Sequence, residues 1–151
     1  YEPEQRGVVI AYASVYGGTE NAANILACRL REQGVQVEMF DTSVTPVSYI
    51  LAAAFRFSHV VLAAPTYNGG VFVTMENLLH DLTAHGLKGR RAAYIENGSW
   101  APTSARGMQK LLEPLNWETA ADTVTLRSAL RQGQQEDLER MAMQLAESVK
   151  A

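Results

Sequence analysis

The spacing of apolar residues changes back and forth along the chain between the period of a strand and the period of a helix. Apolar runs of strand length occupy 8–13, 35–40, 59–64 and 91–96, and a fifth lies within 117–126. Between them, apolar residues recur every three or four positions, which predicts helices over 19–33, 47–57, 73–85, 104–115 and 134–150. The run at 35–40 alternates with polar residues and predicts an edge strand. The run at 59–64 is apolar throughout and predicts a central strand covered on both faces.

This alternation of strands and helices predicts an α/β fold. Strictly alternating elements give parallel strands joined by right-handed crossovers, with helices on both faces of the sheet. Five strands fit a doubly wound parallel sheet of order 2-1-3-4-5, in which ligands bind near the switch point between strands one and three. The loops at 14–19, 65–70 and 97–102 all follow carboxyl ends of strands. We therefore place the candidate site at this edge of the sheet.

The first of these loops has the composition of an anion site and reads Ser14-Val15-Tyr16-Gly17-Gly18-Thr19. A helix N-terminus leaves backbone N–H groups unpaired and carries partial positive charge, and nearby hydroxyls can add donors. No lysine follows the glycines, so neither the Walker pattern nor the three-glycine dinucleotide pattern is present. The alternative is a tight turn in which Gly17 and Gly18 supply positive φ and Thr19 caps the helix.

Aromatic and amide side chains mark the other two loops. Tyr67 and Trp100 can each stack on a flat ring, which contributes about 0.5–1.5 kcal/mol beyond burial, or can pack against a neighbouring helix. Asn68 and Asn97 can hydrogen-bond the heteroatoms of such a ring, but Asn before Gly is also a common turn. Both interpretations stay open at the level of the sequence.

Length and composition limit the remaining choices. At 151 residues, with 47% apolar and 19% charged residues, the chain fits one domain, placed at 7–151 after a polar, linker-like lead-in at 1–6. A net charge of −3 gives no basic face for nucleic acid, so a small molecule or a protein is the expected partner. No apolar run is long enough to span a membrane and no signal peptide precedes the first strand, which favours a cytoplasmic setting.

Cysteine and histidine usage suggests no further chemistry. The single cysteine, Cys28, excludes an internal disulfide, and its helical surroundings predict a small buried hydrophobe. The histidines show no metal-ligand spacing, so we expect surface or structural roles for His59, His80 and His85 and no metal site in this chain.

Charged residues flank the strand at 91–96. Arg90 and Arg91 are expected to be solvated where this strand starts. Glu96 is expected to be a carboxylate in water where it ends, in preference to a group that disfavours negative charge on a cofactor.

Taken together, the three loops resemble those of a known family over essentially the whole chain. The stretches that carry the resemblance read Ala13-Ser14-Val15-Tyr16-Gly17-Gly18-Thr19-Glu20, Ala64-Pro65-Thr66-Tyr67-Asn68 and Asn97-Gly98-Ser99-Trp100. They are similar to the FMN loops of the flavodoxin-like domain of flavodiiron proteins, also called A-type flavoproteins. The tyrosine in the first loop and the Pro-Thr-Tyr-Asn run in the second are the most specific features.

The resemblance implies a flavodoxin-like sheet that binds FMN. It places the phosphate among Ser14, Val15, Tyr16, Gly17, Gly18 and Thr19. It places one side of the isoalloxazine ring against Pro65, Thr66, Tyr67, Asn68 and Gly69, and the other side against Asn97, Gly98, Ser99, Trp100 and Ala101. The family commonly has asparagine where this chain has Gly18, so phosphate binding here depends more on backbone N–H groups. Gly98 likewise replaces an aromatic residue.

The resemblance also implies partners. In that family the domain passes electrons to a diiron centre in a preceding metallo-β-lactamase-like domain, where dioxygen or nitric oxide is reduced. This chain would then be the electron-transfer part of an oxidoreductase, with rubredoxin or a flavin reductase as donor and a homodimer in the full-length form. The family's diiron motif, H-x-E-x-D-H, is absent from this chain.

Two other functions remain open. One is a free-standing flavodoxin or an FMN-dependent quinone reductase, in which the flavin itself reduces a substrate. The other is a flavin-free module of the response-regulator type, which would need an acidic cluster at the ends of strands one and three. This chain has Ala13-Ser14 and Ala64-Pro65 there, so the flavin-free function ranks last.

Overall fold

A computed structural model describes residues 2–13, 18–67, 70–98, 102–126 and 132–151. Its strands are β1 (Gln5–Tyr12), β2 (Val37–Asp41), β3 (Phe57–Tyr67), β4 (Gly70–Val71), β5 (Arg91–Asn97), β6 (Glu118–Thr119) and β7 (Val124–Leu126). Its helices are α1 (Gly18–Glu32), α2 (Val47–Arg56), α3 (Val73–Ala84), α4 (Ser104–Leu112), the 3₁₀ helix η1 (Glu113–Leu115) and α5 (Gln132–Lys150). Each predicted helix and strand is present, with ends that differ by a few residues.

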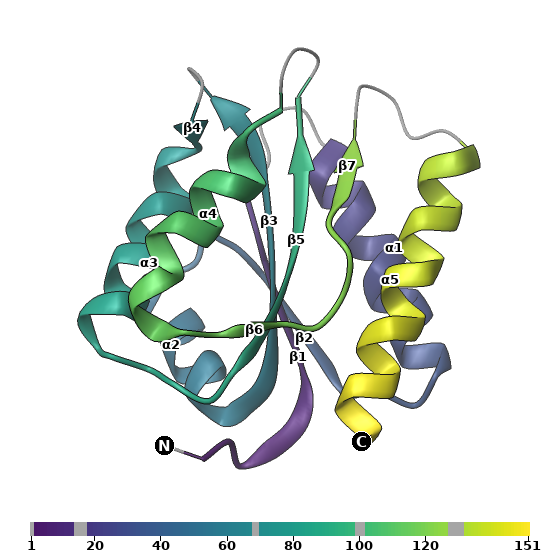
Figure 1. The fold of residues 1–151 in the computed structure, drawn as a ribbon, viewed down its shortest axis with the longest axis horizontal. Helices are drawn as coiled ribbons and strands as arrows, with labels where there is room; N and C mark the ends of the chain where they lie inside the picture. The colour runs from purple at the N-terminus through teal and green to yellow at the C-terminus, as the bar shows by residue number, and fades with distance from the viewer. Residues whose placement is uncertain (1, 14–17, 68–69, 99–101, 127–131) are drawn as a thin grey trace.

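The sheet has the predicted doubly wound order (Figure 1). Its strands lie in the order β2-β1-β3-β5-β6, and β7 also pairs with β5, so two short strands share the last position. These neighbours are all parallel. In the numbering of the five predicted strands this order is 2-1-3-4-5, which confirms the flavodoxin-like α/β prediction. β2 lies at the edge, as its alternating pattern predicts.

The short strand β4 has no counterpart in the sequence pattern. It pairs antiparallel with the end of β3, with Thr66 opposite Val71 and Tyr67 opposite Gly70. A two-residue strand is too short to show a period of two, so apolar spacing cannot predict it.

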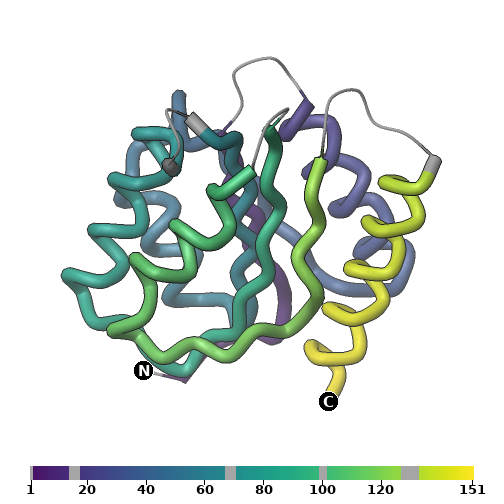
Figure 2. Tube along the Cα trace, turned by 45° about the horizontal axis from the view of Figure 1, so that its top comes forward, coloured from purple at the N-terminus to yellow at the C-terminus, as the bar shows by residue number. Residues whose placement is uncertain are grey.

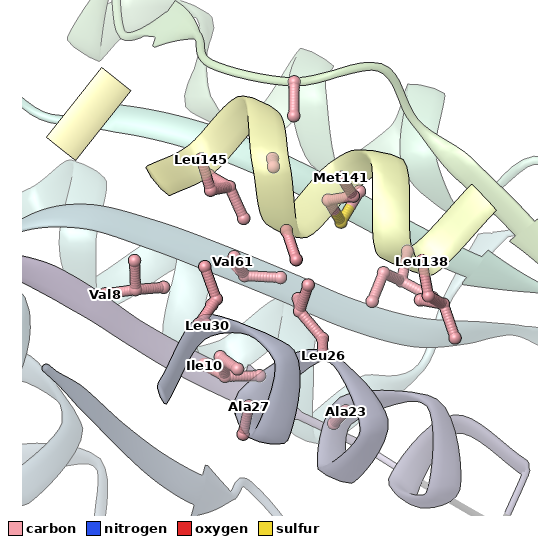
Figure 3. Close-up of a cluster of buried hydrophobic side chains, with 14 of the residues drawn as sticks. Val8, Ile10, Ala23, Leu26, Ala27, Leu30, Val61, Leu138, Met141 and Leu145 are labelled. Atoms are coloured by element: carbon pink, nitrogen blue, oxygen red, sulfur yellow. The ribbon is translucent and has the colours of Figure 1, made fainter. Parts of the chain in front are cut away.

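Two apolar cores cover the two faces of the sheet. On one face, α1 and α5 pack against β1 and β3, and Figure 3 shows Leu26 and Leu30 of α1 pointing toward Met141 and Leu145 of α5. On the other face, α2, α3 and α4 pack against the sheet around Met75, Leu78 and Leu79 among others. Side chains of β3 alternate between these cores, which explains why its sequence is apolar throughout. No helix in the described part of the chain is long and apolar enough to cross a membrane.

The prediction of a buried Cys28 is wrong. The buried positions of α1 include Ala22, Ala23, Leu26, Ala27 and Leu30, which recur at steps of one and then three. One further step of 100° from Ala27 carries Cys28 off this stripe, and its side chain is exposed.

The prediction that Arg90 is solvated is also wrong. Its side chain is buried, and Nε donates to the carbonyl of Ala54 at 2.9 Å while Nη2 donates to that of Phe55 at 2.7 Å. These carbonyls belong to the last turn of α2, where a cation interacts favourably with the helix dipole. Arg91 is exposed, as predicted.

The amino-terminal boundary stays a prediction. β1 begins at Gln5, so the lead-in proposed for 1–6 runs into the first strand. Arg6 donates to the carbonyls of Ser148 and Val149 near the end of α5, which ties the two ends of the described chain together.

Candidate functional site

The residues that flank the three predicted loops meet at the carboxyl edge of the sheet (Figure 2). The ends of β1, β3 and β5 lie there beside the start of α1. Gly18, Thr19, Pro65, Thr66, Asn97 and Gly98 are described, and Tyr67 is described as the last residue of β3. The remaining predicted residues lie outside the described ranges, and these are Ser14, Val15, Tyr16, Gly17, Asn68, Gly69, Ser99, Trp100 and Ala101. Their roles stay predictions.

The first turn of α1 departs from the tight-turn alternative. Gly18 lies inside α1 without a positive φ, and Thr19 is a buried residue of the helix instead of its cap. Glu20, also in this turn, is the acidic residue at the start of α1. Burial, followed by the negative charges of Glu20 and Asp41, raises the pKa of the Tyr12 phenol, so this group stays protonated.

The two arginines that flank the first loop in the sequence lie away from the start of α1. Arg6 is at the opposite end of β1, and Arg29 is two to three turns into α1, where it pairs with Glu32. An anion bound at this helix start is therefore stabilised by backbone N–H groups and the helix dipole.

The N-terminus of α4 is already satisfied by protein groups. Thr66 Oγ1 accepts hydrogen bonds from the backbone N–H groups of Thr103 at 3.0 Å and Ser104 at 3.1 Å. Glu96 Oε1 accepts one from the N–H of Ala105 at 3.1 Å. The carboxylate adds a favourable interaction with the dipole of α4. The ends of β3 and β5 therefore supply the cap that α4 lacks in its own sequence.

The expectation that Glu96 is a carboxylate in water is therefore wrong. Its side chain is half-buried, and Oε2 also accepts a hydrogen bond from Thr125 of β7 at 2.7 Å. No local signal predicts this role, because its partners lie on α4 and β7. Thr66 remains a predicted neighbour of the flavin ring, but its hydroxyl oxygen has a structural role as well.

Asn97 and Gly18 bring the first and third loops together. A Cβ atom built on Gly18 would lie 3.1 Å from Asn97 Nδ2, closer than ordinary van der Waals contact. Gly98 follows in a crowded position, since a Cβ there would lie 3.3 Å from Pro102 Cα and 3.4 Å from Thr66 Cβ. Its N–H donates to the carbonyl of Leu126 at 3.1 Å. A Cβ at Gly18 would force the Asn97 amide to shift by a few tenths of an ångström, whereas one at Gly98 would meet the backbone of Pro102.

His59 lies at the other end of the sheet, away from the candidate cofactor site. It is buried, with Nδ1 2.7 Å from Ser58 Oγ and Nε2 2.7 Å from Ser148 Oγ, beside a pocket of about 570 Å³. Burial, followed by the positive charges of Arg6 and Arg91, lowers the pKa of His59 to about 4. The prediction of a structural role for His59 is confirmed. His80 and His85 are exposed.

Among the described residues, no group of three histidine, cysteine or carboxylate side chains is placed to hold a metal ion.

Comparison with known proteins identifies the family. A family model described as "Flavodoxin domain" matches residues 9–151. The chain belongs to the flavodoxin domain family. FMN is the cofactor that this membership supports.

The relatives of this flavodoxin domain include longer proteins. It is 23% identical over 144 residues to the rubredoxin-oxygen oxidoreductase of Megalodesulfovibrio gigas, a match that covers 95% of this chain and 36% of the relative. The solved structure of the Desulfovibrio gigas protein of that name aligns at a TM-score of 0.93 and 22% identity, over 98% of this chain and 37% of the other. The flavodoxin domain thus spans little more than a third of these relatives.

Two further solved structures share its fold. The flavodiiron protein from Giardia intestinalis aligns at a TM-score of 0.89 and 16% identity, over 97% of this chain and 36% of the other. A flavodoxin from Streptococcus pneumonia aligns at 0.80 and 23% identity, over 93% of this chain and 98% of the other. The predicted resemblance to flavodiiron proteins is confirmed by the matches to longer relatives.

The described donors fit FMN. The phosphate of FMN is an anion, and the first turn of α1 offers backbone N–H groups, the Thr19 hydroxyl and the neighbouring Asn97 amide without a competing carboxylate cap of the kind found on α4. Thr66 and Asn97 lie near the carboxyl ends of the paired strands β3 and β5, at the edge of the sheet where doubly wound folds bind ligands.

Proposed function

We propose that this chain is an FMN electron-transfer domain that passes electrons to a diiron centre in a separate domain, where dioxygen or nitric oxide is reduced. The observation that carries the proposal is the extent of the match. The chain aligns over 98% of its own length but only 37% of the rubredoxin-oxygen oxidoreductase structure, at a TM-score of 0.93. The rest of that relative has room for a second domain, and this chain contains no diiron motif of its own.

In this proposal the site residues divide by the part of FMN that they contact. Residues 14–19 surround the phosphate, and residues 65–69 and 97–101 line the two sides of the isoalloxazine ring. Bound FMN supplies the capacity to take up and release electrons singly or in pairs. The protein holds the phosphate at the start of α1 and orients the ring at the carboxyl edge of the sheet.

The proposed partners follow from the same relatives. The diiron domain would be of the metallo-β-lactamase-like type and would precede this one in a full-length protein. The donor would be rubredoxin, as named in the rubredoxin-oxygen oxidoreductase relatives, or a flavin reductase. A homodimer would bring one protomer's flavin to the other's metals.

The proposal is tested by comparing this domain with the full-length protein that contains it. Oxygen and nitric oxide consumption are measured per FMN, with iron content determined in both. We expect the domain alone to accept electrons from a reductant, to reoxidise slowly in air with peroxide formation, and to show no appreciable nitric oxide reduction. Fast nitric oxide reduction by an iron-free domain would make the flavin itself the catalyst and would contradict the proposal.

A free-standing flavodoxin is the second candidate. It is favoured by the match to the Streptococcus pneumonia flavodoxin, of which this chain covers 98%. The two candidates differ in the mass of the natural gene product. A product of about this chain's length would favour the flavodoxin, whereas one about three times as long would favour the electron-transfer domain.

A further inference from the structure

The last two residues of β5 serve different helices because they point to opposite faces of the sheet. Tyr94 belongs to the core on the α3 and α4 face, and Ile95 to the core on the α1 and α5 face. By the same alternation, Glu96 reaches the N-terminus of α4 and Asn97 lies beside Gly18 at the N-terminus of α1. Each helix start thus has one polar side chain from β5 next to it.

These two side chains differ in charge. The N-terminus of α4 therefore has a negative charge beside it, whereas the N-terminus of α1 has a neutral group. At α4, the Glu96 carboxylate accepts the Ala105 N–H and supplies the negative charge that the helix dipole favours. At α1, Asn97 supplies a neutral amide, and no side-chain hydrogen bond joins this amide to another residue of the described ranges. An amide N–H group can donate to an anion where a carboxylate would repel it.

We propose that Asn97 is a ligand of the FMN phosphate, which it contacts through its side-chain N–H group beside the first turn of α1. This inference rests on the proposed FMN site and moves Asn97 from the ring, where the resemblance places it, to the phosphate. Gly18 makes room for the Asn97 amide at the start of α1. Because it lacks a side chain, the Asn97 amide can lie 3.1 Å from the point where a Cβ would stand.

The first experiment compares two ligands that differ only in the phosphate. Apo-protein with and without Asn97→Ala is titrated with FMN and with riboflavin, and flavin fluorescence reports binding. We expect the variant to lose about ten- to a hundredfold in affinity for FMN, the effect of one hydrogen bond to a charged group, and to keep its affinity for riboflavin. An equal loss for both ligands would return Asn97 to the ring. Wild-type affinity for both would remove it from the site.

An isosteric variant tests whether a negative charge at position 97 opposes binding of the phosphate. Asn97→Asp keeps the shape of the side chain but replaces a donor with a carboxylate next to a dianion. We expect FMN affinity to fall further than in Asn97→Ala while riboflavin affinity stays unchanged. FMN binding as tight as in the wild type would overturn the proposal. If wild-type protein itself binds no FMN, the proposed function fails instead, so the two failures are distinguishable.

A coupled pair of variants tests the role of Gly18. Gly18→Ala places a Cβ against the Asn97 amide and should displace it, with a loss of FMN affinity. In the Asn97→Ala background the same substitution should cost much less, since the crowded amide is gone. Equal effects in both backgrounds would show that the two positions act independently. Unfolding midpoints of the apo-proteins confirm that each variant is folded.

A direct measurement needs no flavin. Inorganic phosphate is added to apo-protein while the side-chain amide signals of the asparagines are followed by NMR. The Asn97 signal, assigned by its absence in Asn97→Ala, should shift with phosphate and not with an equal concentration of chloride. No shift at a phosphate concentration that displaces FMN would overturn the proposal.

Discussion

At the scale of single residues, Arg90 and Arg91 show how much two adjacent residues can differ in burial and in hydrogen-bond partners. Arg90 donates to carbonyls of Ala54, Phe55 and Lys88 from a buried position. Arg91 is exposed, lies 3.3 Å from the Glu118 carboxylate and donates to Ser148 Oγ at 3.1 Å. Arginine suits the buried role because its planar guanidinium presents several donors in fixed directions.

We therefore expect Arg90→Met to lower the free energy of unfolding by about 2–4 kcal/mol, because several carbonyls lose a charged donor in a buried place. Arg91→Met is the matched control, and its exposed ion pair should be worth about 0–1 kcal/mol. Urea unfolding of both variants gives the two values. Equal losses in the free energy of unfolding would mean that the buried guanidinium of Arg90 stabilises the fold no more than the exposed one of Arg91.

Thr19 allows a second test at this scale. It is buried in the first turn of α1 but does not cap the helix, so its hydroxyl is free of the capping role that the sequence alone leaves open. Thr19→Val should weaken FMN binding by about ten- to a hundredfold, or about 1.5–3 kcal/mol, with little change in the unfolding midpoint of the apo-protein. Unchanged FMN affinity would remove Thr19 from the phosphate site.

At the scale of elements, β3 and α5 are joined by a buried polar chain from Ser58 through His59 to Ser148. The unfolded chain binds a proton on His59 near its ordinary pKa of 6.5, whereas the folded chain does so only near pH 4. Between these pH values the unfolded state holds more protons than the folded state. The stability associated with the neutral, buried His59 is therefore complete above pH 6.5 and is lost as the pH falls toward 4.

The free energy of unfolding should therefore rise with pH in this window by up to about 1.4 kcal/mol per pH unit from His59 alone. Unfolding is measured at several pH values for the wild type and for His59→Asn, which cannot titrate. The variant should show a shallower slope whatever its absolute stability. Parallel slopes would mean that another group causes the dependence.

The start of α4 depends on a side chain from another strand. Thr66→Val removes the acceptor for the N–H groups of Thr103 and Ser104 without a large change in volume. By analogy with other helix caps, it should lower the free energy of unfolding by about 1–2 kcal/mol. Thr123→Val, at an exposed position, is the control. A loss of flavin affinity without a loss of stability would instead assign Thr66 to the cofactor alone.

At the scale of the whole molecule, apolar spacing predicts the fold well and the polar contacts poorly. The strand at 59–64 and the helix pattern around Leu26 and Leu30 suffice to predict the sheet and its two covered faces, because burial follows the period of each element. Glu96 and Arg90 differ from prediction because their partners lie far away in sequence. The site was predicted to lie at the carboxyl edge, where its described residues meet, since strand order alone determines that edge.

The two cores share one sheet, so the domain should unfold in a single transition that FMN shifts as a whole. At a free FMN concentration 100 times Kd, the stabilisation should be about 2.7 kcal/mol. Calorimetry with FMN and with riboflavin measures it, and riboflavin should stabilise less. Two separate transitions, only one of them moved by FMN, would show that the faces of the sheet unfold independently.

The alternation along β5 also constrains how the length of this strand can change during evolution. Deleting one residue within 91–95 would turn every following side chain to the other face. The carboxylate of Glu96 would then face the start of α1, where it would compete with an anionic ligand, and α4 would be left with an amide. Insertions and deletions in this strand should therefore be tolerated in pairs and selected against singly. We therefore expect relatives that bind the same ligand to keep the parity of this strand's length.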